Sequence, residues 1–512
     1  MRWKWIFASA VILVIALMVA AYAVLATYDY TKLKPQIERM VKDATGRELT
    51  LRGDVDFIIG YPPVLLATDV VFANAPWGSK PQMITVDRLR VEMRLLPLLV
   101  REVVLHYLGL SGVEVFLETD PNGKGNWVLL GDRPGKKVAT RKPLGIDIGR
   151  ISVENLHLIY HRGKTGLAAH YTIDQLDVAP EEAAQRLAIG LQARYNEQPV
   201  VVSGQTGVIR DLGSPERFPV ELSGMFAKAK FEITGAVEDI LGLQGIMLKV
   251  HVSGTDLADL GFNKTIRLPQ TKVFDVTALL KGAKESLALE DVDGHLSGSG
   301  VDLAFSGRVG NATASSDFDL QLSGTGQDLT TIGSIIGKTL PVTDQFAFSG
   351  HLRDATESLS FEDAKASANR GSLSVVLSGR VEDVRNVSGL DLHVEGLGKN
   401  LADMTPIIGI NLPATENFAV AGRLRGSARM LSLEAAQGHL QQGRLNLKLN
   451  GQIRNLLAFS GVDLSVNGWG ADLAQMGKIF DIALPATDAF KVEGRLTGST
   501  ESLSFKEAHA SA

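Results

Sequence analysis

Apolar and polar residues alternate along most of the chain. Residues 88–96 (RLRVEMRLL) place arginines and a glutamate at one set of alternate positions, with leucines, a valine and a methionine at the other. Residues 371–381 (GSLSVVLSGRV), 389–396 (GLDLHVEG), 444–451 (RLNLKLNG) and 461–468 (GVDLSVNG) show the same alternation. A period of two is typical of strands that bury one face. The sequence therefore predicts a mainly β protein with short helices between groups of strands.

The strand patterns recur at a fixed 72-residue interval. Leu-Pro pairs begin at residues 268, 340, 412 and 484, and a phenylalanine follows at residues 274, 346, 418 and 490. Such spacing indicates a stack of equivalent units, each with about four strands and one short helix such as residues 400–409. The final residues 501–512 (ESLSFKEAHASA) match residues 357–368 (ESLSFEDAKASA), which lie in the middle of a unit. We therefore expect the last unit to be incomplete, and the source protein to continue past residue 512 with at least two more strands.

An apolar segment near the N-terminus has the length of a membrane span. Residues 6–27 carry no charge, and as a helix they would extend about 33 Å. A cleaved signal peptide is the alternative, supported by Ala-Tyr-Ala at residues 21–23, but its apolar region is usually only roughly 7 to 15 residues long. We therefore predict a retained anchor. Two basic residues precede it, so the positive-inside rule leaves residues 1–5 in the cytoplasm and sends the remainder across the membrane.

These patterns divide the chain into six parts. We expect a cytoplasmic N-terminus, a transmembrane anchor, an N-terminal β region, a polar linker, a β-rich middle region and the repeats, at residues 1–5, 6–27, 28–130, 131–145, 146–252 and 253–512, respectively.

Composition removes several classes of function. Lys and Arg together number 52 against 57 Asp and Glu, so the chain lacks the positive excess of a dedicated nucleic-acid binder. It has no cysteine, which excludes disulfides, thiolate zinc sites and a cysteine nucleophile. Because of this charge balance, nucleic acid is not expected among the partners.

Glycine-rich motifs that would suggest nucleotide binding are incomplete. Residues 333–339 (GSIIGKT) are one residue short of a phosphate-binding loop, whose backbone cradle depends on its length. Glycine triplets GTG, GLG and GWG lack the third glycine of a dinucleotide site, and their recurrence indicates a structural turn or bulge. They begin at residues 324, 396 and 468.

Candidate metal sites are equally weak. His157 and His161 would share one face of a strand, but no further ligand is evident near them. Residues 291–294 (DVDG) lack the downstream glutamate of a calcium loop and are better explained as a turn. We therefore predict a protein that is not an enzyme, with no catalytic residue, no metal and no cofactor.

Four motifs follow the apolar segment in order. They are residues 45–55 (TGRELTLRGDV), 62–78 (PPVLLATDVVFANAPWG), 94–118 (RLLPLLVREVVLHYLGLSGVEVFLE) and 123–127 (GKGNW). With the apolar segment, they resemble the N-terminal region of the AsmA family over residues 1–130. The resemblance implies an inner-membrane protein whose bulk lies in the periplasm of a Gram-negative cell, similar to chorein-type bridge proteins that carry phospholipids along a β-sheet groove.

The apolar side of the repeat strands must be covered, because large exposed apolar patches are rare in soluble proteins. One solution is protein, with two sheets or a sheet and helices packed together. The other is lipid, with the sheet curved into an open groove that holds acyl chains. The residue pattern alone supports protein and lipid as the cover nearly equally, and the family resemblance favours the groove. Its predicted lining is Leu373, Val375, Leu377, Leu390, Leu392, Val394, Leu445, Leu447, Leu449, Val462, Leu464 and Val466.

We therefore expect a protein that carries or shields phospholipid between the inner and outer membranes. Its expected partners are phospholipid, the inner membrane through the N-terminal helix, and an outer-membrane protein. Two alternatives remain: an assembly factor that guides outer-membrane proteins by strand addition to a sheet edge, and a passive envelope tether.

Overall fold

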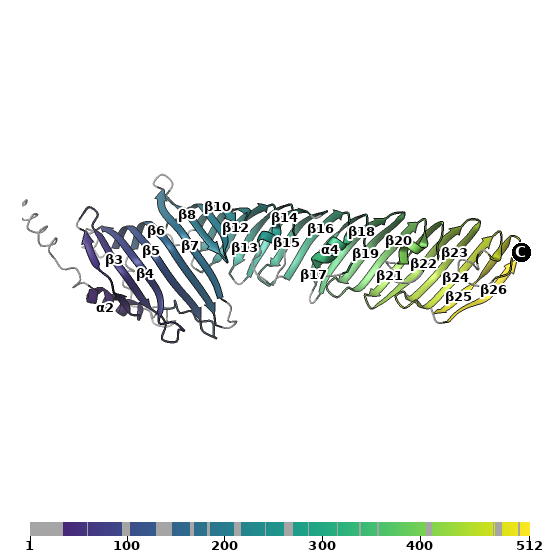
Figure 1. Cartoon of the computed structure of the whole chain (residues 1–512), viewed down its shortest axis with the longest axis horizontal. Coiled ribbons are helices and arrows are strands. Elements are labelled where there is room, and N and C mark those ends of the chain that lie inside the picture. Colours follow the sequence, from purple (N-terminus) through teal and green to yellow (C-terminus); the bar gives the residue numbers. More distant parts are fainter. Residues whose placement is uncertain are drawn as a thin grey trace, which may run out of the picture. The chain divides into compact units, whose positions relative to one another are not determined.

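The chain is mainly β, as predicted. The computed structural model contains 26 strands among the residues that it describes (Figure 1). These residues are 34–58, 60–94, 103–129, 146–163, 168–181, 185–208, 217–240, 242–260, 270–284, 286–298, 300–314, 316–336, 339–355, 358–405, 412–474, 476, 484–499 and 502–511.

The predicted anchor at residues 6–27 and the predicted linker at residues 131–145 lie outside the described residues. Within the described ranges, no helix combines the length and the apolar character that a membrane span requires.

The chain forms two compact units, residues 1–248 and 249–512. The first unit begins with helix α2 (Lys34–Thr45). Its strands are β1 (Leu49–Leu51), β2 (Val55–Ile58), β3 (Val64–Ala73), β4 (Gln82–Arg94), β5 (Val103–Thr119), β6 (Ile146–Arg162), β7 (Ala168–Glu181), β8 (Arg186–Tyr195), β9 (Gln198–Thr206), β10 (Phe218–Phe226) and β11 (Ala229–Asp239). Strand β12 (Gln244–Gly254) contains the boundary between the units. The predicted division at residues 252 and 253 remains a sequence-based prediction.

In the first unit, β1 and β2 pair with opposite halves of β3. Strands β3, β4 and β5 are antiparallel, β5 and β6 are parallel, and β6 to β11 continue antiparallel. Parity along these strands places Val55, Ala67, Val86 and Val113 in one buried cluster, and Ile37 of α2 packs against it. The helix therefore covers the short strands at the start of the sheet.

The second unit is an antiparallel meander in which each described strand pairs with the next from β13 to β26. Its strands are β13 (Val273–Ala283), β14 (Ser286–Gly298), β15 (Val301–Asn311), β16 (Ser316–Gly326), β17 (Gln345–Ala355), β18 (Ser358–Arg370), β19 (Leu373–Asp383), β20 (Ser388–Gly398), β21 (Asn417–Ser427), β22 (Met430–Gln442), β23 (Leu445–Asn455), β24 (Ser460–Gly470), β25 (Phe490–Ser499) and β26 (Ser502–Ser511). Short helices η4 (Leu257–Leu260), α4 (Leu329–Ile336) and η5 (Leu401–Met404) lie between groups of strands.

Equivalent strands of the second unit lie at a constant distance along the chain. Strands β13, β17 and β21 begin at residues 273, 345 and 417, and β16, β20 and β24 begin at residues 316, 388 and 460. Each step equals the 72-residue interval of the sequence pattern. Helices α4 and η5 are separated by the same interval, since they begin at Leu329 and Leu401.

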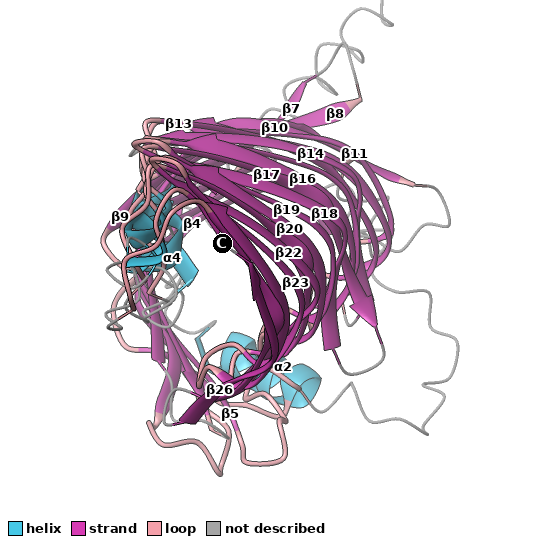
Figure 2. Ribbon diagram, turned by 90° about the vertical axis from the view of Figure 1, so that its right-hand side faces the viewer, coloured by secondary structure: helices cyan, strands magenta, loops and turns pink. Residues whose placement is uncertain are grey.

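Backbone irregularities in the second unit recur with the strands. Asp291, Asp363 and Ala435 have φ angles of 49°, 49° and 46°, and each lies where the register of β14, β18 or β22 shifts by one residue. An extra residue of this kind is a β-bulge, which increases local twist and bends the strand. Figure 2 shows that the strands of this unit bend to one side, and that α4 lies on that side.

Two expectations about turns need correction. Residues 291–294 do not form a turn between strands, because they lie inside β14 around its bulge. The glycines at 324, 396 and 468 are also neither turns nor bulges, because they lie within β16, β20 and β24 at positions of regular pairing. Their recurrence has a packing cause: a Cβ on Gly324 would lie 2.5 Å from the Phe348 ring, and one on Gly468 would lie 2.7 Å from Leu447 Cδ2.

Candidate functional site

The twelve candidate residues lie on one face of the second unit. Directly opposite residues of paired strands share a face, and Leu377 lies opposite Val394 in the β19–β20 pair. The same face continues through β21 and β22 to Leu449, which lies opposite Val466. We call this surface the apolar face. The opposite, polar face carries Ser374, Ser378, His393, Lys448 and Ser465.

Burial divides the candidates into two groups. Five are almost fully covered by protein: Leu373 (2% exposed), Leu445 (1%), Leu447 (2%), Val462 (2%) and Leu464 (7%). The other seven are partly exposed: Val375, Leu377, Leu390, Leu392, Val394, Leu449 and Val466. The five covered residues therefore behave as core, and only the seven others offer surface to a ligand.

Helix η5 covers one end of the apolar face. Leu401 of η5 forms a buried cluster with Leu373, Phe418, Leu440 and Leu447, and Met404 packs against the same cluster. Because η5 and α4 occupy equivalent places and α4 lies on the side toward which the strands bend (Figure 2), the apolar face is the concave one.

Residues of the turn between β23 and β24 cover the other end of the apolar face. Leu456 and Phe459 pack against the cluster that contains Ile453, Val462 and Leu464. All the described strands of the second unit belong to one meander, so its own helices and turns, rather than a second sheet, cover these ends. Between them, Leu377, Leu392 and Val394 stay partly exposed.

A hydrogen-bonded clamp holds each crossover segment at the sheet. The Oδ1 atom of Asn400 accepts from Ala402 N (3.1 Å) and Thr415 N (3.2 Å), and Thr415 Oγ1 accepts from Leu401 N (2.9 Å). The side chain of Asn400 thus caps η5, while Thr415 joins the two ends of the crossover. The same contacts occur between Asp256 and Thr271, Asp328 and Thr343, and Asp472 and Thr487.

The threonine of this clamp was not predicted from the sequence. Its signal was present, because threonines at positions 271, 343, 415 and 487 recur in step with an Asp or Asn at positions 256, 328, 400 and 472. The local sequence around each threonine has no feature that indicates its distant hydrogen-bond partner.

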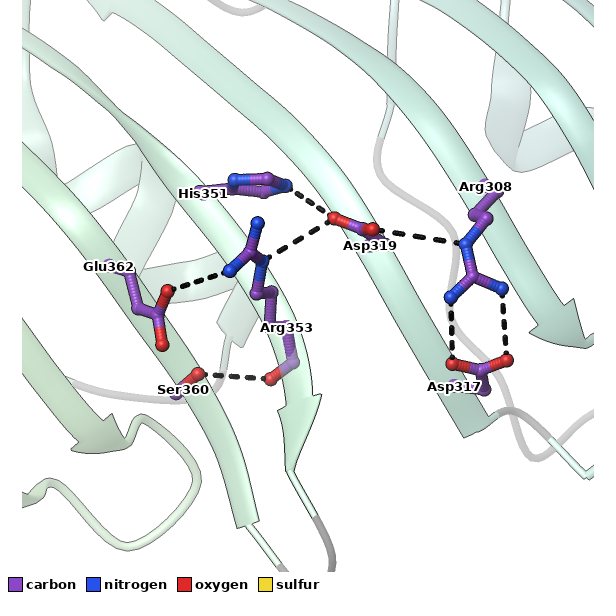
Figure 3. Close-up of polar contacts among 7 residues, drawn as sticks. All are labelled: Arg308, Asp317, Asp319, His351, Arg353, Ser360 and Glu362. Carbon is purple, nitrogen blue, oxygen red and sulfur yellow. Dashed lines mark hydrogen bonds and ion pairs between the residues drawn. The ribbon is translucent and has the colours of Figure 1, made fainter.

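The polar face carries ion pairs that link neighbouring strands. Figure 3 shows Asp319 of β16 between Arg308 of β15 and His351 and Arg353 of β17, with Arg353 also paired to Glu362 of β18. Equivalent pairs join Asp391 to Arg423 and Asp463 to Arg495. Arg495 Nε and Nη2 contact the two oxygens of Asp463 at 2.6 and 2.8 Å.

Asp391 is the most strongly perturbed of these carboxylates. Hydrogen bonds from the Arg423 guanidinium, with a further contribution from Arg425, lower the pKa of Asp391 to about 2. The side chains of Arg423 and Arg425 are 51% and 46% exposed, respectively. Water therefore screens the pair, and its contribution to stability is expected to be small.

The four N-terminal motifs meet in a buried polar network in the first unit. Asn74 Nδ2 donates to Glu118 Oε1 (2.9 Å), and Asn126 Nδ2 donates to Asn74 Oδ1 (2.9 Å). Arg47 Nη2 donates to the Asn126 carbonyl (3.2 Å). Each motif supplies one of these residues, so the network joins the segment after α2 to the ends of β3 and β5. The sequence alone did not indicate a structural role for these motifs.

The weak motifs lie in ordinary structural elements. Residues 333–336 of the GSIIGKT sequence are the last residues of α4. His157 and His161 lie on β6. Among the described residues, no group of three or more His, Asp or Glu side chains is arranged to hold a metal ion.

The fold and the site define an antiparallel repeat sheet whose concave apolar face is partly covered. In a comparison with known proteins, the model of the AsmA family matches residues 1–233, which confirms the resemblance found in the N-terminal motifs. The chain is also 25% identical over 331 residues to the AsmA family protein YhjG of Escherichia coli (strain K12). That match covers 58% of this chain and 46% of the relative, so the chain spans about half the length of the relative. No solved structure matches.

Proposed function

We propose that this protein carries or shields phospholipid acyl chains on the apolar face of its second unit. The observation that carries the proposal is the partial exposure of Leu377, Leu390, Leu392 and Val394, which follow one another across a concave sheet face. Burial of an acyl chain there gains about 0.8 kcal/mol for each CH₂ removed from water. Polar headgroups would remain outside the sheet in water.

The setting of this activity is part of the proposal. The uncharged residues 6–27 and the AsmA family match support an inner-membrane anchor. We further propose that the two units lie in the periplasm and that an outer-membrane protein receives the lipid. No residue is proposed to do covalent chemistry, so lipid would move down a gradient or under the action of partner proteins.

Photo-crosslinking at three positions tests the proposal in cells. A crosslinker at Leu392 should capture phospholipid, because that position is partly exposed on the apolar face. One at His393 should not, because it lies on the polar face, and one at Leu373 should capture little, because protein covers it. Equal capture at all three positions, or none at any, would contradict the proposal.

The same crosslinks separate the alternatives. Capture of unfolded outer-membrane proteins would support an assembly factor that acts by strand addition. Capture of neither lipid nor protein, in cells that need the protein for envelope integrity, would support a tether.

A further inference from the structure

The hairpin between β2 and β3 exposes apolar side chains at its tip. Ile58 is 51% exposed and Tyr61 is 101% exposed, whereas Val55 at the start of β2 is only 3% exposed. We call Ile58, Tyr61 and Pro62 the hairpin tip. Single exposed apolar residues are common on soluble proteins, so the position of the tip in the first unit decides its significance.

The tip lies near the segment that would emerge from a bilayer. Lys34, the first residue of α2, donates through Nζ to the Gly53 carbonyl, and Glu38 Oε1 accepts from Leu51 N. Ile58 is five residues beyond Gly53, at most about 17 Å at 3.3 Å per residue. Residues 28–33 extend at most about 20 Å, and the uncharged residues 6–27 precede them. The tip is therefore within reach of any bilayer that holds those residues.

The chemistry of the tip fits the headgroup layer of a membrane. Tyrosine rings prefer this layer, because one end of the side chain is apolar and the other is polar. Strand β4 ends beside the tip, because Met93 N donates to the Pro63 carbonyl (3.3 Å). The last residue of β4, Arg94, is exposed. A cation at this place attracts anionic headgroups. The exposed Asp56 would oppose them, but it lies two residues further from the tip than Ile58.

We propose that the hairpin tip is a second membrane contact that inserts into the headgroup layer of an anionic phospholipid bilayer. The contact rests on the retained anchor of the proposed function, and it goes beyond that function by orienting the first unit at the membrane. Two attachment points, the anchor and the tip, would restrict rotation of this unit relative to the membrane.

The opposite end of β3 provides a matched control. Trp77 and Trp127 are 40% and 43% exposed there, and tryptophan also favours membrane interfaces. This end lies beyond the C-terminus of α2, where Arg47 contacts the Asn126 carbonyl. The Trp127 ring lies against Tyr160, with centroids 6.1 Å apart, so packing within the protein competes with insertion of this ring into a bilayer. We therefore expect no membrane contact at this end.

Fluorescent labels at the two ends test the inference directly. The chain has no cysteine, so Tyr61→Cys and Trp127→Cys each accept one environment-sensitive label. The full chain is reconstituted in vesicles of phosphatidylethanolamine and phosphatidylglycerol, and flotation confirms that it is anchored. Headgroup nitroxides should quench the label at residue 61 several-fold more strongly than the label at residue 127. Equal quenching, stronger quenching at residue 127, or failure to float would overturn the inference.

A charge at the tip separates this contact from the lipid site of the second unit. With a label at Ile58→Cys, an added Tyr61→Glu change should abolish quenching, whereas Tyr61→Phe should preserve it. Lipid capture at Leu392 should be unaffected by either change if the apolar face functions as proposed. Absence of lipid capture at Leu392 without any tip substitution, with quenching at residue 58 intact, would instead remove the proposed function and leave the membrane contact standing. Quenching that Tyr61→Glu leaves unchanged would overturn the contact.

Discussion

The strand sets β17–β20 and β21–β24 follow one pattern but cover their apolar faces to different degrees. Leu392 is partly exposed, whereas its equivalent in the second set, Leu464, is 7% exposed. Val375 is partly exposed, whereas its equivalent Leu447 is 2% exposed. Equal strand patterns can therefore produce either a surface open to a ligand or a closed core.

The difference comes from turns and side-chain size. The turn before β20 reads VRNV at residues 384–387, whereas the equivalent turn before β24 reads LLAF at residues 456–459. Leu456 and Phe459 of the second turn pack against the cluster around Val462 and Leu464. The equivalent residues of the first turn are Val384 and Val387, which are smaller, so this turn covers less of its strands. Lipid contact is accordingly expected mainly on β19 and β20.

The largest expected effect is a charge on the covered surface. Leu464→Asp should destabilise its strand set by at least about 3 kcal/mol, because the carboxylate would be buried without a partner. The matched Leu392→Asp should cost about 1 kcal/mol, because water reaches that position. Hydrogen exchange of β20 and β24, measured with urea unfolding, compares the two. Equal losses would mean that the two sets are covered equally.

Leu447 illustrates the value of this comparison. The sequence predicted Leu447 as part of the lining of an open groove, where an aspartate would meet lipid rather than packed protein. The residue lies beneath Leu401 in a buried cluster, so the change would test the core instead. Leu392→Asp is the suitable variant, with a large loss of lipid capture and a small loss of stability.

Added volume at the equivalent glycines should give the next largest effect. A Cβ on Gly468 would lie 2.7 Å from Leu447, whereas one on Gly396 would meet Val420 at 3.1 Å. We expect Gly468→Ala to cost about 1–3 kcal/mol, and Gly396→Ala to cost less, because overpacked side chains must leave their preferred rotamers. Urea unfolding measures both. A second change, Leu447→Val, should recover part of the loss in Gly468→Ala; no recovery would indicate another cause.

Loss of one crossover clamp should have an effect of similar size. Thr415→Val removes the acceptor for Leu401 N, and an unsatisfied buried N–H costs about 1–3 kcal/mol. Thr415→Ser keeps the hydroxyl and should stay close to the original protein. Hydrogen exchange at the Leu401 amide reports the contact directly. The clamp would have no role there if exchange were equally slow in the valine and serine variants.

The smallest expected effect is on the polar face. On this face, hydrogen bonds donated by Arg423 lower the pKa of Asp391 to about 2. The usual value in the unfolded chain is about 3.9. The pair therefore stabilises the fold above about pH 4, and the contribution disappears as the pH falls from there through about 2. Melting temperatures of the original chain and Asp391→Asn should differ slightly at pH 7 and converge near pH 2. A difference that grows in acid would have the wrong sign for this pair.

The sequence by itself determined the strands, the face each residue occupies and the 72-residue interval of the pattern. Alternation of side chains is a local property, because successive residues of a strand point to opposite faces. Leu392 and His393 could therefore be assigned to opposite faces without knowledge of any distant contact. The N-terminal motifs likewise indicated the resemblance to the AsmA family, although the sequence did not show what their side chains contact.

Only the tertiary structure decided how much of the apolar face is covered. Leu447 and Leu449 have the same residue type and parity, yet Leu447 belongs to the buried cluster that contains Leu401, whereas Leu449 packs against that cluster and stays partly exposed. The clamp between Asn400 and Thr415, and the network from Arg47 to Glu118, also join residues that are distant in sequence. Burial and such contacts depend on which segments the fold brings together, and a period of two residues contains no information about that.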